Sequence, residues 1–320
     1  MKLKHAASGL SHGHRALPEH AEKAVKQALA KAGLERANAI LLFLTPEYAA
    51  NPEPALRAAA RAGGCMQVVG CTGAGILTED EWVLDSPGAA AMVLGGNVHL
   101  SIAPQGKLSD EDTVLSLCTP AGLTAEWIDV AARRFGAVSG DLFGHGPFKV
   151  WSGARVAESE QVDAILSGVD SVIGASQGVR ALTSPIEVAE VQGYDIKRLG
   201  NYPALSVLVQ SLPPNVREME RVPLHLIMGG VAIGDPETAI REGRYRLNHI
   251  VAANLRDQSI TLSERPARGE RLFWAMRDAL TAERDMRACV ARSVQALPGA
   301  PDFALLFPCI GRGPNFFGNR

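Results

Sequence analysis

The sequence lacks paired cysteines, an excess of charge of one sign and any long apolar run. Its five cysteines are an odd number without paired spacing, so in a chain of 320 residues we expect reduced thiols and a cytoplasmic protein. The formal net charge of -2 comes without any block of like charge, which argues against nucleic acid or an anionic membrane as a partner. Apolar runs such as AILLFL are far shorter than a membrane span, and the N-terminus carries no apolar segment of the kind found in secretory signals.

What is present is the composition of a globular protein. Hydrophobic residues make up 47% and charged residues 21%, and the length allows two domains of ordinary size. The first seventy residues predict a helix over 18–34, a strand buried on both faces over 39–45, a helix over 54–64 and a strand over 66–72. This order predicts a βαβ unit with a covered sheet.

The rest of the chain predicts a mixture of both element types. Residues 89–103 predict a hairpin around 95–97, and 186–199 predict two strands joined at Gln192 and Gly193. Helices are predicted over 124–136, 160–168, 202–212 and 269–297, and antiparallel strands between 223 and 265. A final apolar strand over 303–307 is similar to the strand over 39–45. The predicted fold class is therefore α/β (mixed α+β), with two pseudo-related layered halves that each have a central β-sheet covered by helices.

The sequence GCTGAG, residues 70–75, fits neither common phosphate-binding motif. A dinucleotide-binding loop needs a third glycine where this chain has Thr78, and a P-loop needs a lysine where it has Ile76. Cys71 is compatible with two interpretations. A helix start just after it would lower its pKa and favour a nucleophile, although the sequence names no base beside it, whereas a strand end would make it a small buried thiol.

Ser176 lies in a second motif, GASQG, which matches the G-x-S-x-G nucleophile elbow. An elbow leads directly into a helix, whereas this one leads into a β-rich segment with Pro185, so we expect no catalytic serine. His12 and His14 lack the cysteine or carboxylate ligands of a zinc signature, so we expect no metal site. The protein is accordingly predicted not to be an enzyme.

Several longer segments resemble the FIST proteins (F-box and intracellular signal transduction). ILLFLTPEY and VVGCTGAGILTEDEW resemble the N-terminal half of that family, and PIEVAEVQGYDIKRLGNYPAL resembles the segment that joins its halves. YRLNHIVAANLRDQSITLSERPARGERL and FALLFPCIGRGPNFFG resemble the C-terminal half. The resemblance implies a FIST N-terminal domain over 1–198 and a FIST C-terminal domain over 199–320, apparently truncated at its end.

The resemblance also implies a function. It indicates a cytoplasmic sensory module that binds a small ligand such as an amino acid and signals through a separate protein, without catalysis and without a cofactor. A haem-binding nitric oxide sensor and a protein-interaction scaffold are the alternatives. Because ligands in α/β sheets sit beyond the carboxyl ends of strands, the expected ligand-binding residues lie in the turn after Val69 and in the turn after Pro308, with one further cation. They are Cys71, Thr72, Gly73, Ala74, Gly75, Arg246, Cys309, Gly311, Arg312 and Gly313.

For this ligand site two interpretations also stay open. The glycine loop either lets backbone amides approach a ligand or only turns a corner, and Arg312 is either a carboxylate-binding fork or an exposed turn residue.

Overall fold

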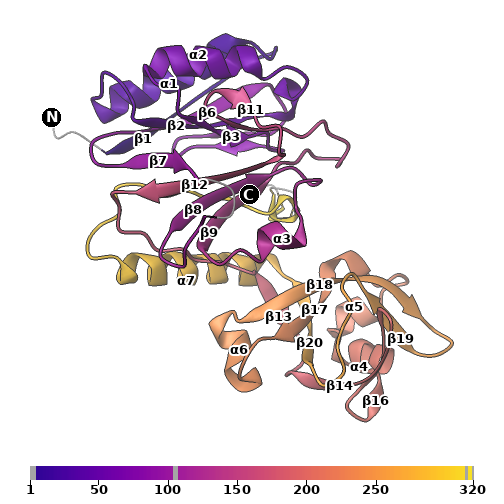
Figure 1. Ribbon diagram of the computed structural model, residues 1–320. Coiled ribbons are helices and arrows are strands. Elements are labelled where there is room, and N and C mark those ends of the chain that lie inside the picture. Colours follow the sequence, from indigo (N-terminus) through magenta and orange to yellow (C-terminus); the bar gives the residue numbers. More distant parts are fainter. Residues whose placement is uncertain (1–4, 104–106, 314–315, 319–320) are drawn as a thin grey trace. The chain divides into compact units, whose positions relative to one another are not determined.

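A computed structural model describes residues 5–103, 107–313 and 316–318. The chain forms two compact units, one of residues 1–173 and 296–320 and one of residues 174–295 (Figure 1). These units are defined by compactness and do not coincide with the two family domains predicted over 1–198 and 199–320. The boundary between the family domains stays a prediction.

The first unit has three layers, with helices α1 and α2 on one face of a six-stranded sheet and a four-stranded sheet on the other (Figure 1). The six-stranded sheet has the order β1-β6-β2-β3-β10-β11, and the four-stranded sheet has the order β7-β12-β8-β9. The elements of this unit are β1 (Ala6–His12), α1 (Pro18–Ala32), β2 (Ala39–Leu44), η1 (Pro46–Tyr48), α2 (Glu53–Gly63), β3 (Val68–Cys71), β4 (Ile76–Leu77), β5 (Trp82–Val83), β6 (Gly88–Leu94), β7 (His99–Ile102), β8 (Thr113–Cys118), α3 (Ala125–Ile128), β9 (Arg133–Val138), β10 (Val150–Ser152), β11 (Arg155–Val156), β12 (Gln161–Ser167) and η3 (Ile310–Arg312).

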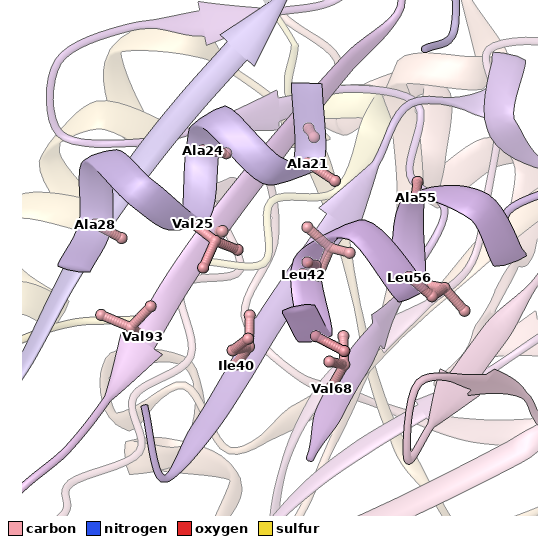
Figure 2. Close-up of a cluster of buried hydrophobic side chains, with 14 of the residues drawn as sticks. Ala21, Ala24, Val25, Ala28, Ile40, Leu42, Ala55, Leu56, Val68 and Val93 are labelled. Atoms are coloured by element: carbon pink, nitrogen blue, oxygen red, sulfur yellow. The ribbon is translucent and has the colours of Figure 1, made fainter. Parts of the chain in front are cut away.

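The predicted βαβ unit is confirmed as β2-α2-β3, whose strands pair in parallel. Alanines dominate the buried stripes of α1 and α2, which lets both helices lie close to the sheet (Figure 2). Val25 of α1 and Leu56 of α2 pack there with Ile40, Leu42 and Val68 of the strands (Figure 2). The other face of β2 and β3 forms a second core with the four-stranded sheet. Burial on both faces explains why β2 is apolar at every position.

The second unit is built on a closed ring of antiparallel strands. In the ring, β14 pairs with β15, β15 with β19, β19 with β18, β18 with β17, β17 with β20, and β20 again with β14. Helix α4 contributes Leu205 and Leu208 to its core. The elements are β13 (Val179–Ala181), β14 (Ile186–Gln192), β15 (Asp195–Leu199), β16 (Tyr202–Pro203), α4 (Ala204–Ser211), α5 (Pro214–Arg217), η2 (Leu224–Leu226), β17 (Ile227–Ala232), α6 (Pro236–Glu242), β18 (Tyr245–Asn254), β19 (Ser259–Leu262), β20 (Arg271–Arg277) and α7 (Ala279–Ala296).

The mixed α/β class is confirmed, but several predicted elements were wrong. Residues 160–168 are strand β12 and not a helix, and most of 124–136 is the short α3 followed by β9. The long helix predicted from residue 269 begins only at Ala279, because β20 occupies its first part. The turn at 95–97 joins strands of two different sheets and makes no hairpin. The antiparallel pair at 186–199 is confirmed.

The predicted strand over 303–307 is also wrong. Phe303, Leu305 and Phe307 pack on the core between the two sheets while Ala304 and Leu306 face outward, so the alternation of a strand is present. Within the described part of the chain, however, no strand pairs with this segment. It therefore gives no support to a repeat of β2, on which the two pseudo-related halves depended.

Candidate functional site

The glycine loop after β3 is tied into the sheet by its own backbone. The N–H of Thr72 donates to the carbonyl of Lys149 at 2.9 Å, and the N–H of Gly73 donates to the carbonyl of Leu44 at 3.0 Å. The amide of Gly73 is thus already used within the fold. This removes one of the donors that the sequence offers to a ligand.

Close packing accounts for two glycines of the loop. A Cβ on Gly70 would lie 1.7 Å from the carbonyl oxygen of Leu42, and a Cβ on Gly75 would lie 2.3 Å from the side chain of Leu84. A Cβ on Gly73 would meet only the carbonyl oxygen of Gly75, at 3.2 Å. Gly70 and Gly75 are therefore needed for the approach of neighbouring chain segments. This favours the corner interpretation for these two positions.

Cys71 and Thr72 are buried between the two sheets. Burial raises the pKa of the Cys71 thiol to about 12, with a smaller contribution from the neighbouring Cys118. A buried and protonated thiol is a poor nucleophile, which fits the strand-end interpretation of Cys71. The hydroxyl of Thr72 lies 2.7 Å from that of Ser139, which in turn donates to the carbonyl of Thr72 at 2.9 Å. This pair joins the glycine loop to the segment after β9.

The predicted site residues near the C-terminus lie in the first unit as well. Cys309 is exposed and precedes η3, which holds Gly311 and Arg312, and Gly313 follows in extended conformation. The preceding Phe307 ring packs 5.8 Å from the ring of Phe43 on β2. The segment before Cys309 thus lies against the same core as Cys71.

Arg246 and Ser176 belong to the second unit. Arg246 on β18 forms an ion pair with Glu270 at 3.1 Å and is largely exposed. The predicted residues are therefore distributed over both units. Ser176 donates to Asp285 at 2.7 Å and is followed by strand β13, where an elbow has a helix. Asp285 also accepts from the N–H of Gly178 at 3.0 Å, which holds this turn in place.

A cavity of about 570 Å³ lies elsewhere in the first unit, at one end of the four-stranded sheet. Its wall combines the starts of β8 and β9 with the end of β12 and the segments that follow β12 and α7. The lining residues are Glu111, Asp112, Thr113, Arg133, Ile165, Leu166, Ser167, Val169, Asp170, Ser171, Val172, Ala296, Leu297 and Pro298. None of them is among the site residues predicted from the sequence.

The lining carries charge of both signs. Arg133 donates one guanidinium N–H to the carbonyl of Ser171 at 2.8 Å, which orients the side chain along the wall. Asp112 is occupied by the N–H and hydroxyl of Ser109, at 2.8 and 2.9 Å. The carboxylates of Glu111 and Asp170 have no hydrogen-bond or ion-pair partner among residues 5–103, 107–313 and 316–318. A cation and two available carboxylates therefore share one cavity.

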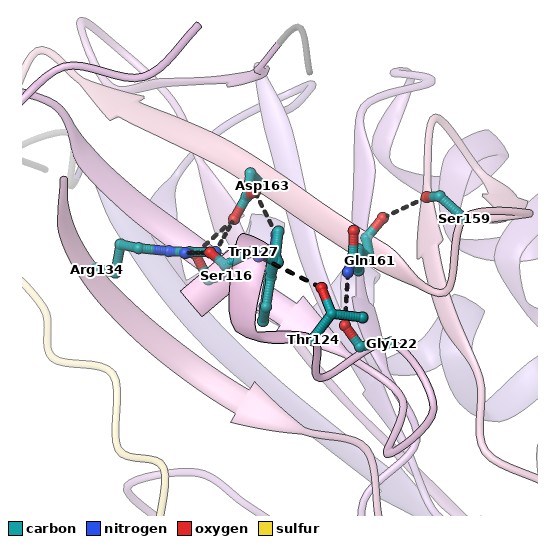
Figure 3. A network of polar contacts seen from close by, with 8 residues as sticks. All are labelled: Ser116, Gly122, Thr124, Trp127, Arg134, Ser159, Gln161 and Asp163. Atoms are coloured by element: carbon teal, nitrogen blue, oxygen red, sulfur yellow. Dashed lines mark hydrogen bonds and ion pairs between the residues drawn. The ribbon is translucent and has the colours of Figure 1, made fainter. Parts of the chain in front are cut away.

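The strands that carry the cavity are fixed by a polar network on the same sheet (Figure 3). The guanidinium of Arg134 donates to Ser116 at 2.8 Å and to Asp163 at 2.9 Å, and it lies 4.1 Å above the ring of Trp127. Asp163 also accepts from the indole N–H of Trp127 at 2.7 Å and from Ser116 at 2.6 Å. These bonds connect β8, β9, β12 and α3 (Figure 3). The register that places Arg133 in the cavity wall is thereby stabilised.

Sequence reasoning missed the cavity because two of its strands were predicted as helices. Arg133 fell in the predicted helix over 124–136, and Ile165 to Ser167 fell in that over 160–168. One signal was present, since the acidic run Asp110-Glu111-Asp112 directly precedes the largely apolar segment TVLSLC, which forms the buried strand β8. Among the described residues there is no group of His, Cys, Asp and Glu able to hold a metal ion. In the same part of the chain no helix has the length and apolarity to cross a membrane.

This architecture is that of a mixed α/β protein with a charged cavity in its N-terminal unit, and the comparison with protein families is more specific. The model of the FIST N domain matches residues 38–201, just over half of the chain. The chain belongs to the FIST family, a family of signal-transduction sensor domains. The assignment rests on the FIST N domain alone, and the F-box expansion of the family name is wrong.

Curated relatives come from mycobacteria. Uncharacterized protein Rv0628c of Mycobacterium tuberculosis is 28% identical over 205 residues, which cover 62% of this chain and 53% of that protein. Uncharacterized protein Mb0898c of Mycobacterium bovis is 31% identical over 186 residues, which cover 57% of this chain and 47% of that protein. The chain thus spans about half the length of the curated relatives that it matches.

Proposed function

We propose that this chain is a non-catalytic sensory module that binds a small zwitterion, such as an amino acid, in the cavity of its first unit. The observation that carries the proposal is the presence of Arg133, Glu111 and Asp170 in the lining of one cavity. A guanidinium is the preferred partner of a carboxylate, and a carboxylate is the preferred partner of an ammonium group. A zwitterion carries both groups.

The size and the lining of the cavity fit a small polar ligand. About 570 Å³ lies within the range of roughly 300–1,000 Å³ that is common for small-molecule sites. Ile165, Leu166 and Val169 contribute apolar surface beside the charged groups. Such surface accommodates an apolar side chain, while the charges fix the main-chain groups of the ligand.

Haem fits this cavity poorly. Its lining includes no His, Cys, Met or Tyr, the residues that supply axial ligands to haem iron. Haem is included in the ligand screen as the alternative outcome. A scaffold function is the remaining alternative, and it predicts that no small molecule changes the melting temperature.

We also propose that the protein acts in the cytoplasm and passes its signal to a separate protein. All five cysteines are free in the structure, which suits a reducing compartment. The loop of residues 71–75 together with Arg312 stays a second possible location of the ligand. It is less favoured because the Gly73 amide already donates to Leu44.

A thermal-shift screen tests the proposal. The probes are each of the twenty amino acids, together with the amine that lacks its carboxylate and the acid that lacks its ammonium group. We expect one or more amino acids to raise the melting temperature and the two truncated analogues to have little effect, because each lacks the partner of one wall charge. Haem and unrelated carboxylates complete the screen. The proposal is wrong if no amino acid changes the melting temperature or if both truncated analogues act as well as the parent.

Variants then locate the site. Arg133→Ala removes the guanidinium, Asp170→Asn removes one negative charge at constant size, and Arg155→Ala removes an exposed arginine of β11 as a matched control. Arg312→Ala tests the second location. We expect the response to be lost in the first two variants and kept in the other two. Loss with Arg312→Ala alone would move the ligand to the glycine loop.

A further inference from the structure

The core of the second unit holds two polar side chains on either side of a glycine. In the strand register, Gly229 of β17 is paired with Asn248 of β18 on one side and with Trp274 of β20 on the other. Residues directly opposite each other in a sheet point to the same face. This face is the inside of the ring, since Trp274 packs there with Leu262 and Leu272.

Both polar groups are buried without a partner. Asn248 is 2% exposed and Trp274 is fully buried. The side-chain oxygen of Asn248 and the indole N–H of Trp274 make no hydrogen bond within the described residues. An unpaired polar group destabilises a core, so native cores satisfy such groups with protein atoms or with water. One of these groups is an acceptor and the other is a donor.

Gly229 leaves room between them. A Cβ built on Gly229 would lie 3.4 Å from side-chain atoms of Leu262 and Leu272, which is ordinary van der Waals contact. Gly229 therefore places no side chain between the two polar residues, and the side chains of Leu262 and Leu272 do not fill its Cβ position.

A second tryptophan in the first unit provides a contrast. Trp151 is also paired in register with a glycine, Gly70, and its buried indole N–H is also without a partner in the described structure. A Cβ on Gly70 would lie 1.7 Å from the carbonyl oxygen of Leu42. The carbonyl of Leu42 thus fills the position that stays free at Gly229. The two tryptophans differ in whether main chain covers the glycine opposite them.

We infer that one water molecule is bound inside the ring above Gly229, where it donates a hydrogen bond to Asn248 Oδ1 and accepts one from Trp274 Nε1. The site selects a small molecule that both donates and accepts a hydrogen bond, because it lies between an unpaired acceptor and an unpaired donor. It lies in the second unit and is independent of the proposed ligand cavity.

The test observes the water directly. The four tryptophans give four indole N–H signals in the ¹⁵N-labelled protein, which single Trp→Phe variants assign. We expect a cross-peak between a long-lived water and the indole of Trp274, and none for Trp151. Trp127 donates to Asp163 at 2.7 Å and serves as the internal control for a satisfied indole. The absence of a cross-peak at Trp274 would overturn the inference.

Gly229→Ala gives a second test, because it changes the urea midpoint of unfolding in opposite directions when a water is bound and when the space is dry. If water is bound, the new methyl group displaces it, leaves both polar groups unpaired and lowers the urea midpoint of unfolding. If the space is dry, the methyl group adds apolar contact and reduces the freedom of the unfolded chain, so the midpoint rises. We expect a lower midpoint together with loss of the cross-peak. A higher midpoint contradicts the bound water. If the variant fails to fold, the cross-peak at Trp274 in the unsubstituted protein decides whether the water is bound.

Discussion

Replacing Gly70 by alanine is expected to destabilise the first unit more than the same change at any other glycine of the loop. The added Cβ would lie 1.7 Å from the carbonyl oxygen of Leu42 and 2.8 Å from the indole nitrogen of Trp151. Real Cβ atoms essentially never come within 3.0 Å of a neighbour, so the strands must separate or the glycine must move. Neither is easy, because β2 and β3 pair in the middle of the six-stranded sheet.

The size of the effect follows from what the Cβ meets. Overpacking a well-ordered core costs about 1–3 kcal/mol, and a clash with backbone belongs at the upper end because a carbonyl cannot rotate away. A loss of about 3 kcal/mol corresponds to a decrease in melting temperature of roughly 6–12 °C for a unit of this size. At Gly75 the nearest atom belongs to the mobile end of Leu84, so about 1–2 kcal/mol is expected.

Gly73→Ala is the matched control for this series. Its Cβ would meet only the carbonyl oxygen of Gly75, at 3.2 Å, and we expect a change below about 0.5 kcal/mol. Urea unfolding of the three variants, followed by tryptophan fluorescence and circular dichroism, gives the order directly. Equal losses at Gly70 and Gly73, or a larger loss at Gly73, would refute the packing explanation of the loop.

Two further predictions concern buried polar groups of the first unit. Because burial raises the pKa of Cys71 to about 12, a thiol reagent at pH 8 should modify the exposed Cys309 at once and Cys71 only on unfolding. For the same reason Cys71 contributes its full share of stability below about pH 8.5, where the thiol of the unfolded chain is neutral. This contribution decreases as the pH rises toward 12, because the unfolded chain then loses a proton that the folded protein keeps. Urea midpoints of unfolding measured at pH 8 and pH 10 test this decrease. Fast modification of Cys71 in the folded protein would contradict this. Asp163→Ala leaves the guanidinium of Arg134 without its carboxylate and should cost about 2 kcal/mol by urea unfolding, whereas the double variant Asp163→Leu with Arg134→Met should lose less. An unchanged midpoint in Asp163→Ala would show that the network contributes nothing.

The sequence predicted the parts of the fold that depend on local pattern. The continuous apolar run of β2, the short helix α2 and the turn at Gly193 each carry a signal within a few residues. Strand β12 was missed because QVDAILS is short and mostly apolar, and such a run satisfies both helical and strand spacing. Strand β9 was missed because the run AARR over residues 131–134, where the strand begins, favours a helix, and only pairing with β8 makes the segment a strand.

The candidate site was harder to predict because it is assembled over long distances in the sequence. Arg133 lies in a segment that was predicted as a helix, and it lines the same cavity as Asp170 only when β8, β9 and β12 pair. The glycine loop stood out in the sequence, yet Gly70 and Gly75 are explained by packing. A motif rich in glycine reports a close approach, and the sequence does not say whether a ligand or the protein itself makes it.

Calorimetric titration of an amino acid found in the screen tests the central claim most directly. If Arg133 binds the carboxylate and Asp170 the ammonium group, Arg133→Ala and Asp170→Asn should each weaken binding about ten- to a hundredfold, since a hydrogen bond to a charged group contributes roughly 1.5–3 kcal/mol. Arg155→Ala should bind as tightly as the parent. If both cavity variants also keep the affinity of the parent while remaining folded, the ligand does not bind in this cavity.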